Sequence, residues 1–532
     1  MIRAISSNYN AGGMDLVMPY ADLVLKNANV ITMDATQSHA EMVAVKEGKV
    51  WVVGGNDLLE EVRGAGTKVI DCRGKTLVPG FNDAHCHTFS FVRKLLSVDL
   101  SPPAIGSIAD IKDVIARQAQ NTPTDQWIVG TDYNDFSLAE KRHPTRHDID
   151  EVAPDHPVVI SHRSLHGCVL NSRALALAGI SSETPEPPGA TIERDLTDGE
   201  PNGVLYEMLG FIREKVMPPW SEEELDKGMS LINKHYLSQG LTSMQDATVV
   251  NDYQRWQTFR RYIDAGKLNV RVYMMFGPES AGQFREAGLT FGAGDSRLRL
   301  GGMKIVPSSP GGQLYPPQPE LNRLVLETHQ NGFPVAIHAI RESTVEAVAV
   351  AYEYVQAQIP KPDIRHRVEH CAECPPPLLE RLRRLQVVIA TQPPFFYYSG
   401  DRYLATVDKE ILPHLYRVRS FFNAGVVVAG SSDSPIVSNN PLIGIYGAVT
   451  RKTASGAQLQ SNETIRPEQA LAMYTTNAAY ASHEEGIKGS ITPDKLADMV
   501  LLSDDPTSVE AEAIKDISVE MTVIGGNVVW EA

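Results

Sequence analysis

Residues 79–87 have the sequence Pro79-Gly80-Phe81-Asn82-Asp83-Ala84-His85-Cys86-His87 and end an apolar run that begins at position 77. In an extended strand, side chains at positions i and i+2 point to the same face, so His85 and His87 would share one face and Cys86 would point away. Two imidazoles at this spacing can bind one metal ion such as zinc. Two polar residues in a surface turn would produce the same pattern, so the interpretation depends on partners elsewhere in the chain.

The middle of the chain alternates between short apolar runs and helical patterns, which is typical of βα units around a parallel sheet. Eight such runs can be counted, at 77–85, 242–247, 270–276, 302–306, 335–338, 366–370, 387–391 and 426–430. Helices fit between them: Ser221 and Glu224 predict a capping box, and Ser343 and Glu346 predict a second one. Eight units in one series predict an α/β fold, a (β/α)8 TIM barrel.

The two ends of the chain differ from the middle, because alternating apolar residues and turn signals predict short β-strands there. We therefore expect residues 20–76 and 485–532 to form one small composite β-sandwich domain and residues 77–484 to form the barrel. The interval between the first and second runs is much longer than the others and contains strand patterns of its own. Residues 100–220 are therefore expected to be an insertion after barrel strand 1, on the face where barrel active sites lie.

Three further residues with metal-binding side chains stand at or just after the ends of apolar runs. His338 ends the fifth run, His370 ends the sixth, and Asp433 follows the eighth. A single histidine in this position is usually a satisfied core or loop residue. Because a barrel collects its catalytic groups at the carboxyl ends of its strands, the three together with His85 and His87 predict one metal site.

Lys304 lies inside the fourth run, flanked by apolar residues and glycines. Burial of a charged lysine is costly and shifts the amine towards its neutral form. A neutral amine can react with carbon dioxide to form a carbamate, an anionic group that can bridge two metal ions. The alternative is that Lys304 pairs with an acidic side chain or binds an anionic part of the substrate.

The composition of the chain excludes several classes of protein. Among 532 residues, 49 are basic and 65 acidic, and the formal net charge of −16 argues against a nucleic-acid partner. Five cysteines spread over this length do not make a disulfide framework. Neither a signal peptide nor a long apolar span is visible, so we expect a cytoplasmic protein without a membrane partner.

The sequence resembles the amidohydrolase superfamily, and more narrowly its YtcJ-like group, which includes N-substituted formamide deformylases. The resemblance extends from Ala21-Asp22-Leu23-Val24 through residues 77–87 to the segment GSITPDKLADMVLLSDDP at 489–506. It implies metal ligands on barrel strands 1, 4, 5, 6 and 8, which correspond here to His85, His87, Lys304, His338, His370 and Asp433. It also implies one or two divalent metal ions per chain, with zinc expected, a carboxylated Lys304 bridging two of them, and a homodimer.

The implied activity is hydrolysis of a C–N bond, of the amide or formamide type, in a small organic substrate by metal-activated hydroxide. Asp433 would take the proton from water and pass it to the leaving amine. From the insertion, His166 would hydrogen-bond the developing oxyanion and Tyr133 would orient the substrate. The alternatives are a mononuclear deaminase or other hydrolase on the same barrel, and a non-catalytic scaffold. Arg341-Glu342 stands after His338 where many relatives have Gly-Asp, so the substrate stays open.

Overall fold

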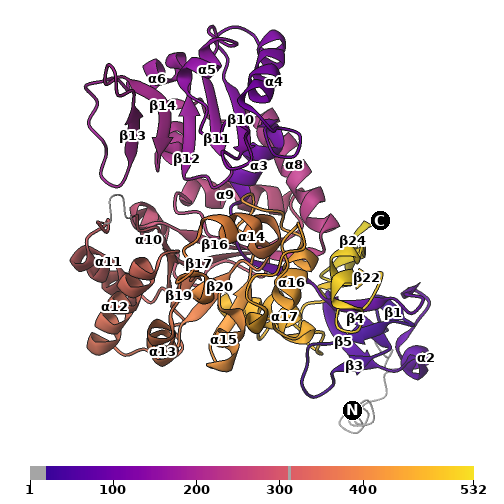
Figure 1. Ribbon diagram of the computed structural model, residues 1–532. Helices are drawn as coiled ribbons and strands as arrows, with labels where there is room; N and C mark the ends of the chain where they lie inside the picture. The colour runs from indigo at the N-terminus through magenta and orange to yellow at the C-terminus, as the bar shows by residue number, and fades with distance from the viewer. Residues whose placement is uncertain (1–19, 309–312) are drawn as a thin grey trace.

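The computed structural model describes residues 20–308 and 313–532 and arranges them in four β-sheets with helices around them (Figure 1). The largest sheet has eight strands, and every neighbouring pair in it is parallel. Its strands are β8 (Phe81–Cys86), β15 (Leu241–Asp246), β16 (Arg271–Phe276), β17 (Leu298–Ile305), β18 (Val335–Ala339), β19 (Arg367–His370), β20 (Val388–Thr391) and β21 (Val427–Gly430). The predicted α/β barrel is confirmed.

The barrel is completed by hydrogen bonds between the end of β8 and the loop that follows β21. The Asp433 N–H donates to the carbonyl of His85 at 2.8 Å, and the His87 N–H donates to the carbonyl of Ser434 at 2.8 Å. The first and last strands of the series are thereby joined at their carboxyl ends.

The first apolar run is not one strand, as the sequence predicts, but two. Residues Thr76–Pro79 form β7, which pairs with strands from the chain ends, and β8 begins only at Phe81. Gly80 separates them where the backbone passes close to β15, since a Cβ at this position would lie 2.2 Å from the Thr242 hydroxyl oxygen. Only glycine allows the chain to cross from one sheet to the other at this distance.

Helices follow the barrel strands and cover the outside of the barrel. They are α3 (Thr88–Leu96), α8 (Glu222–Ser238), α9 (Tyr253–Asp264), α10 (Ala281–Glu286), α11 (Gln318–Gln330), α12 (Glu342–Gln358), α13 (Pro376–Arg384), α14 (Pro394–Thr406), α15 (Val418–Asn423), α16 (Pro441–Thr450), α17 (Pro467–Met473) and α18 (Thr476–Ala481). Their apolar faces form one large core with the outward-facing side chains of the strands. Short helical turns η3 (Pro278–Ser280), η5 (Leu412–His414) and η6 (Ser461–Glu463) lie in the connections.

The two predicted capping boxes have different outcomes. At the start of α8 the Glu224 N–H donates to Ser221 Oγ at 3.2 Å and the Ser221 N–H donates to the Glu224 carboxylate at 2.8 Å, so the first box is confirmed. The second is wrong, because α12 begins at Glu342, before the predicted cap. The Glu342 N–H donates instead to the carboxylate of Glu373, 31 residues away, at 3.0 Å. A tertiary neighbour therefore satisfies this helix end.

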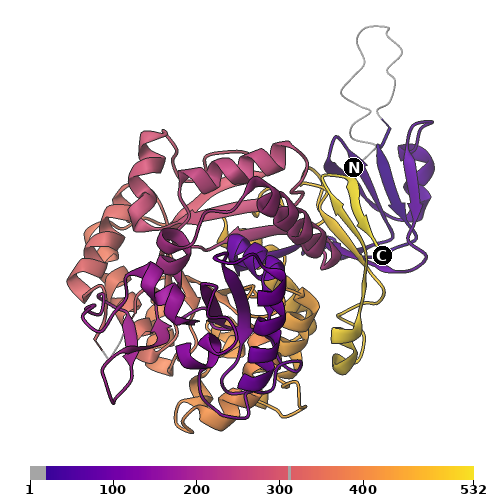
Figure 2. The ribbon, with the colours of Figure 1, turned by 90° about the horizontal axis from the view of Figure 1, so that it is seen from above.

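Strands from both chain ends share a six-stranded sheet with the order β24-β23-β22-β7-β2-β3. A four-stranded sheet, β5-β4-β1-β6, lies with it, and Figure 2 shows the two at one side of the barrel. The division into domains stays a prediction, and its boundary after residue 76 falls within β7. The elements are β1 (Leu23–Lys26), β2 (Asn29–Ile31), β3 (His39–Ala40), β4 (Met42–Lys46), β5 (Lys49–Gly54), η1 (Asn56–Leu58), α2 (Leu59–Val62), β6 (Lys68–Asp71), β22 (Met499–Leu502), η7 (Ala511–Asp516), β23 (Val519–Ile524) and β24 (Asn527–Glu531).

The long connection between β8 and β15 contains a sheet of its own, with the order β13-β14-β12-β11-β10-β9, which lies above the barrel in Figure 1. It packs around two apolar clusters that are separate from the barrel core. The elements are β9 (Val98–Asp99), α4 (Ile108–Asn121), β10 (Ile128–Tyr133), α5 (Arg146–Asp150), β11 (Val158–His162), β12 (Gly167–Leu170), α6 (Ser172–Ala178), β13 (Thr191–Arg194), β14 (Pro201–Tyr206), α7 (Leu209–Phe211) and the π-helical turn η2 (Ile212–Val216). In the described parts of the chain, no helix has the length and apolar character needed to cross a membrane.

A buried ion pair ties the barrel to the terminal sheet and predicts a stability effect. Arg271 of β16 donates to both carboxylate oxygens of Asp498, at 2.6 and 2.8 Å, and both side chains are buried. Replacement Asp498→Ala leaves the guanidinium buried without its counter-charge, so we expect the free energy of unfolding to fall by about 3–5 kcal/mol. Urea denaturation followed by circular dichroism measures the change.

The double variant Arg271→Met with Asp498→Leu is the matched control, because it removes both charges together. We expect it to be more stable than Asp498→Ala. Equal stability of Asp498→Ala and the unmodified chain would show that the pair does not link the two parts.

Candidate metal centre

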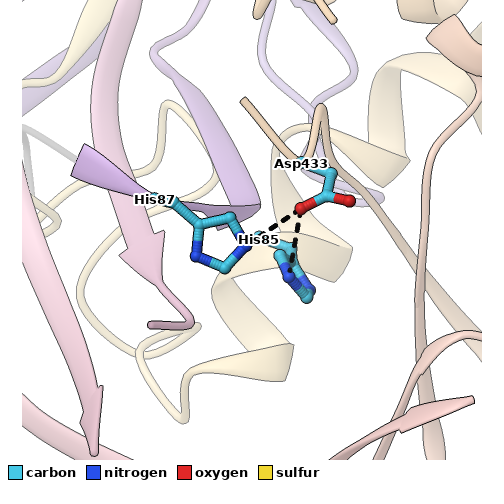
Figure 3. Close-up of side chains that lie close together, drawn as sticks. All are labelled: His85, His87 and Asp433. Carbon is cyan, nitrogen blue, oxygen red and sulfur yellow. Dashed lines mark hydrogen bonds and ion pairs between the residues drawn. The ribbon is translucent and has the colours of Figure 1, made fainter. Parts of the chain in front are cut away.

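Three side chains meet at the point where the barrel closes. His85 lies near the end of β8, His87 follows that strand, and Asp433 lies in the loop after β21. Asp433 Oδ1 is 3.0 Å from His87 Nε2 and 3.5 Å from His85 Nε2 (Figure 3). In the described residues, these three form the one group of histidine, cysteine or acidic side chains whose ligand atoms all lie within 4.8 Å of one another.

The backbone around this cluster is held in place by the first strand. The Ser432 N–H donates to Asp83 Oδ1 at 3.0 Å, and the Ser432 hydroxyl donates to the other carboxylate oxygen. Asp433 has a φ of 56° in the left-handed region, which is uncommon for residues other than glycine. Such a conformation persists only where the surroundings impose it, and here it turns the carboxylate towards the two histidines.

His370 and His338 bring two more imidazoles to the same end of the barrel. The His370 ring centroid is 4.9 Å from that of His85 and 4.5 Å from that of His338. His370 also has a left-handed φ, of 69°, which breaks the alternation of β19. Its ring can therefore lie on the inner side together with Glu369, although the two residues are adjacent in the sequence.

In three of the histidines, Nδ1 contacts a polar side chain outside the cluster. His85 Nδ1 contacts the Glu369 carboxylate, His87 Nδ1 is 3.0 Å from Thr248 Oγ1, and His370 Nδ1 is 2.8 Å from Gln392 Oε1. Metal-binding histidines in proteins characteristically use one ring nitrogen in this way and leave the other for the ion. In all three residues the remaining nitrogen is Nε2. The set therefore fits a divalent metal ion bound by imidazole and carboxylate groups.

The protonation of the imidazoles also suits metal binding. Burial, together with the charge of Lys304, lowers the pKa of His85 to about 3, and burial lowers that of His370 to about 4. Burial and the neighbouring His370 hold the pKa of His338 well below its usual value. Neutral imidazole is the form that binds a metal, so these residues are ready to bind one at neutral pH.

Lys304 lies in β17 with its amine inside the barrel. The side chain is buried, and within the described residues its Nζ has no hydrogen-bond partner. Burial lowers its pKa to about 8, although the charges of Glu369 and Asp433 oppose this effect. Among the described residues Lys304 therefore forms no ion pair or hydrogen bond through its amine, and the carbamate stays a prediction.

The two residues predicted from the insertion have different positions. The His166 ring centroid lies 5.7 Å from that of His338, and His166 Nδ1 is 2.8 Å from Glu207 Oε1. Burial lowers the pKa of His166, but the hydrogen bond and charge of Glu207 outweigh it and raise the value overall. Tyr133 is buried in a core of the insertion, and its hydroxyl is 2.9 Å from His143 Nδ1. The structure thus brings His166, and not Tyr133, to the histidine cluster.

Sequence reasoning missed Arg367 and Glu369 on β19. Arg367 donates to Glu369 Oε1 at 2.7 Å and to the Ala84 carbonyl at 2.7 Å, which connects β19 with β8 through the barrel interior. Although burial raises the pKa of Glu369, the charges of Arg367 and His85 lower it well below its usual value, so the group is a carboxylate. The signal was present, because two charged residues two positions apart in a barrel strand share one face.

Comparisons with known proteins agree with this geometry. The model of the Amidohydrolase family matches residues 68–530. The N-substituted formamide deformylase of Arthrobacter pascens is 32% identical over 96% of this chain and 98% of its own length. The chain belongs to the amidohydrolase family. YtcJ of Bacillus subtilis (strain 168), an amidohydrolase by its name, is 27% identical over 94% of this chain and 98% of its own length.

A crystal structure of a metal-dependent hydrolase from Pyrococcus horikoshii OT3 has the same fold, with a TM-score of 0.74 over 92% of this chain and 99% of its own, at 24% identity. The predicted resemblance to YtcJ-like amidohydrolases is confirmed. This amidohydrolase is an enzyme that hydrolyses carbon–nitrogen bonds.

The contact between Glu369 and His85 predicts an effect on metal affinity. Replacement Glu369→Gln keeps the shape of the side chain but removes the charge that orients the His85 ring. We expect affinity for Zn²⁺ to fall by about 10- to 100-fold, as is usual when such a partner is lost. Competition with a chromophoric chelator measures it.

Glu373→Gln is the matched control, since it makes the same change at a carboxylate that, among the described residues, bonds the Glu342 N–H at the start of α12. Its Zn²⁺ affinity should equal that of the unmodified enzyme. If Glu369→Gln bound Zn²⁺ as tightly as Glu373→Gln, the orienting role of Glu369 would be refuted.

Proposed function

We propose that this amidohydrolase is a metal-dependent enzyme that hydrolyses N-substituted formamides or closely related small amides. Water adds to the carbonyl carbon, the C–N bond breaks, and a carboxylate and an amine are released. The observation that carries the proposal is a set of three histidines, His85, His87 and His370, that lie near the Asp433 carboxylate. The Nδ1 atom of each contacts a polar side chain outside the cluster, which leaves Nε2 for a metal ion. The N-substituted formamide deformylase relative supports the choice of amide.

His85, His87 and Asp433 would hold one divalent ion, for which zinc is the expected metal, and Lys304, His338 and His370 would contribute to a second. A divalent ion at this position polarises a carbonyl oxygen and lowers the pKa of water towards neutrality. The residues that would bind the two ions lie on four barrel strands, β8, β17, β18 and β19, and in the segments after β8 and β21.

Asp433 is the residue that moves the proton. Although burial raises its pKa, the hydrogen bond from His87 and the charges of His85 and His370 lower the value far below the usual range, so the carboxylate is ionised at neutral pH. Its Oδ1 faces the histidines, and Figure 3 shows the second oxygen pointing away from them. That oxygen accepts a proton from the attacking water and delivers it to the leaving nitrogen.

His166 supplies a hydrogen-bond donor on the side of the insertion. Its Nδ1 is engaged by Glu207, which leaves Nε2 for the substrate. An imidazole donor whose other nitrogen faces a carboxylate stabilises negative charge as it develops on the carbonyl oxygen. Figure 2 shows the insertion lying over the barrel.

Lys304 is proposed to carry the carbamate. The unprotonated amine attacks the carbon of carbon dioxide, an N–C bond forms, and one proton is released, so that the group carries a single negative charge. This offsets the positive charge of a second divalent ion in a buried position. The mononuclear alternative is favoured by one observation: among the described histidine, cysteine and acidic side chains, only His85, His87 and Asp433 form a group within mutual ligand distance, and three residues suffice for one ion.

Metal removal tests the proposed activity. Treatment with a chelator followed by desalting should abolish hydrolysis of an N-benzyl formamide, and Zn²⁺ or another divalent ion should restore it.

Asp433→Asn, which removes the proton acceptor, should lower kcat by about 10²- to 10⁴-fold. Release of formate measures both. Unchanged turnover after chelation, or turnover of esters and aminopurines but of no amide, would overturn the proposal.

Metal stoichiometry tests Lys304. Elemental analysis should find two ions per chain in the unmodified enzyme and one in Lys304→Ala, because the bridging anion is lost. Lys267→Ala, which removes an exposed lysine paired with Asp226, is the control and should retain two. One ion in the unmodified enzyme, with full activity in Lys304→Ala, would establish the mononuclear alternative.

A further inference from the structure

A cavity of about 510 Å³ lies beside the metal centre, between the barrel and the base of the insertion. Its walls come from α3, α7, η2, the start of α8, α9 and the loop after β15. Thr248, whose hydroxyl contacts His87 Nδ1, also lines it. Thr248 therefore contacts both the cavity and the histidine cluster.

Four arginines line this cavity, although the chain as a whole has a net charge of −16. Two of them are paired, since Arg255 lies 2.5 Å from Glu214 and Arg261 lies 3.0 Å from Glu222. The other two, Arg93 and Arg213, form neither an ion pair nor a side-chain hydrogen bond with any described residue. Three carboxylates, Glu214, Glu222 and Asp252, also line the cavity, so its lining carries one more positive than negative charge.

Aromatic rings orient two of the guanidinium groups. Arg93 lies over the Trp220 ring at 4.8 Å, and Arg255 lies over the Phe89 ring at 5.2 Å. A guanidinium stacked on a ring keeps its N–H donors in its own plane, where they can bind a planar or tetrahedral oxyanion. Arg93 is thus held in a defined orientation and still has donors to offer.

The two unpaired charges are partly removed from water. Burial lowers the pKa of Arg213 to about 9, and the charge of Arg93 contributes to this effect. Burial also lowers the pKa of Arg93 to about 10. Two like charges in a partly desolvated cavity are unfavourable unless an anion lies between them.

We propose that this cavity is a binding site for a small oxyanion, a phosphate or carboxylate group, held between Arg93 and Arg213. Paired, charge-assisted hydrogen bonds from arginine are the usual way in which proteins bind such groups. The anion comes either from an acidic substituent of the substrate or from a separate ion. The proposal does not depend on the reaction proposed above, because it concerns binding.

Calorimetric titration with inorganic phosphate tests the site, with potassium chloride used to hold the ionic strength constant. We expect saturable binding to the metal-loaded enzyme, weakened about tenfold or more in Arg93→Met and in Arg213→Met. Methionine keeps the apolar stem and removes the charge. Arg260→Met is the matched control, because Arg260 lies on α9 but pairs with Asp264 and Asp295 and does not line the cavity.

Metal analysis of each variant checks that all carry the same metal content, so that any phosphate bound at the metal centre contributes equally and a difference between variants reports on the arginines. Absence of saturable binding, or equal affinity in the double variant Arg93→Met/Arg213→Met and in Arg260→Met, would overturn the proposal. Thermal unfolding in anion-free buffer checks a purely structural role. An arginine that serves only packing would lower the melting temperature when replaced, and phosphate would then raise the melting temperature of Arg213→Met as much as that of the unmodified enzyme.

Kinetics distinguish the two sources of the anion. If the substrate supplies it, Arg213→Met raises KM for carboxylated formamides only, and phosphate competes with these substrates. If a separate ion binds, phosphate does not change KM for neutral or carboxylated formamides. Its own affinity still depends on Arg93 and Arg213. Either result supports the site, and failure to hydrolyse any formamide would leave the titration result intact.

Discussion

The hydrogen bonds that join the end of β8 to the loop after β21 are the constraint on which the site depends. The same four residues that close the barrel, His85, His87, Asp433 and Ser434, include three of the metal-binding candidates. Barrel closure therefore also brings these three candidates together. The left-handed backbone at Asp433 is held by bonds from the Ser432 and Asp433 N–H groups to Asp83 and His85 before the bend, and by the bond from the His87 N–H to the Ser434 carbonyl after it.

The interior of the barrel carries buried charges that partly compensate one another. Arg367 pairs with Glu369, and Glu369 contacts His85. The charge of Arg367 therefore helps to fix the carboxylate that orients the His85 ring. Lys304 lies close enough to Glu369 and Asp433 for their charges to act on its pKa, but it bonds to neither. A buried network in which one member lacks a partner is costly, and such a cost is expected where a binding site is kept ready.

The insertion changes what the barrel alone would offer. It brings His166 close to His338, and its last turn, η2, contributes Arg213 to a cavity that the insertion and the barrel helices line together. Both features arise from contact between two separately packed cores. Tyr133, in contrast, is consumed by the packing of the insertion itself, where His143 satisfies its hydroxyl. A polar residue near an active site in sequence is thus not necessarily a residue of that site.

Much of this protein could be predicted from the sequence by itself. The barrel strands can be counted from the apolar runs, and the alternation of side chains along a strand is a local property. The sequence therefore sufficed to name the candidates and their strands: His85, His87, Lys304, His338, His370 and Asp433. Contacts between distant segments could not be predicted in this way. The Glu369 partner of His85 is 284 residues away, and the cap of α12 comes from Glu373. The division of the first run at Gly80, the left-handed turn at His370 and the arginine-lined cavity were likewise decided by tertiary structure. The physical reason is that each of them depends on which backbone or side chain lies opposite once the barrel has closed, and a local pattern carries no information about that.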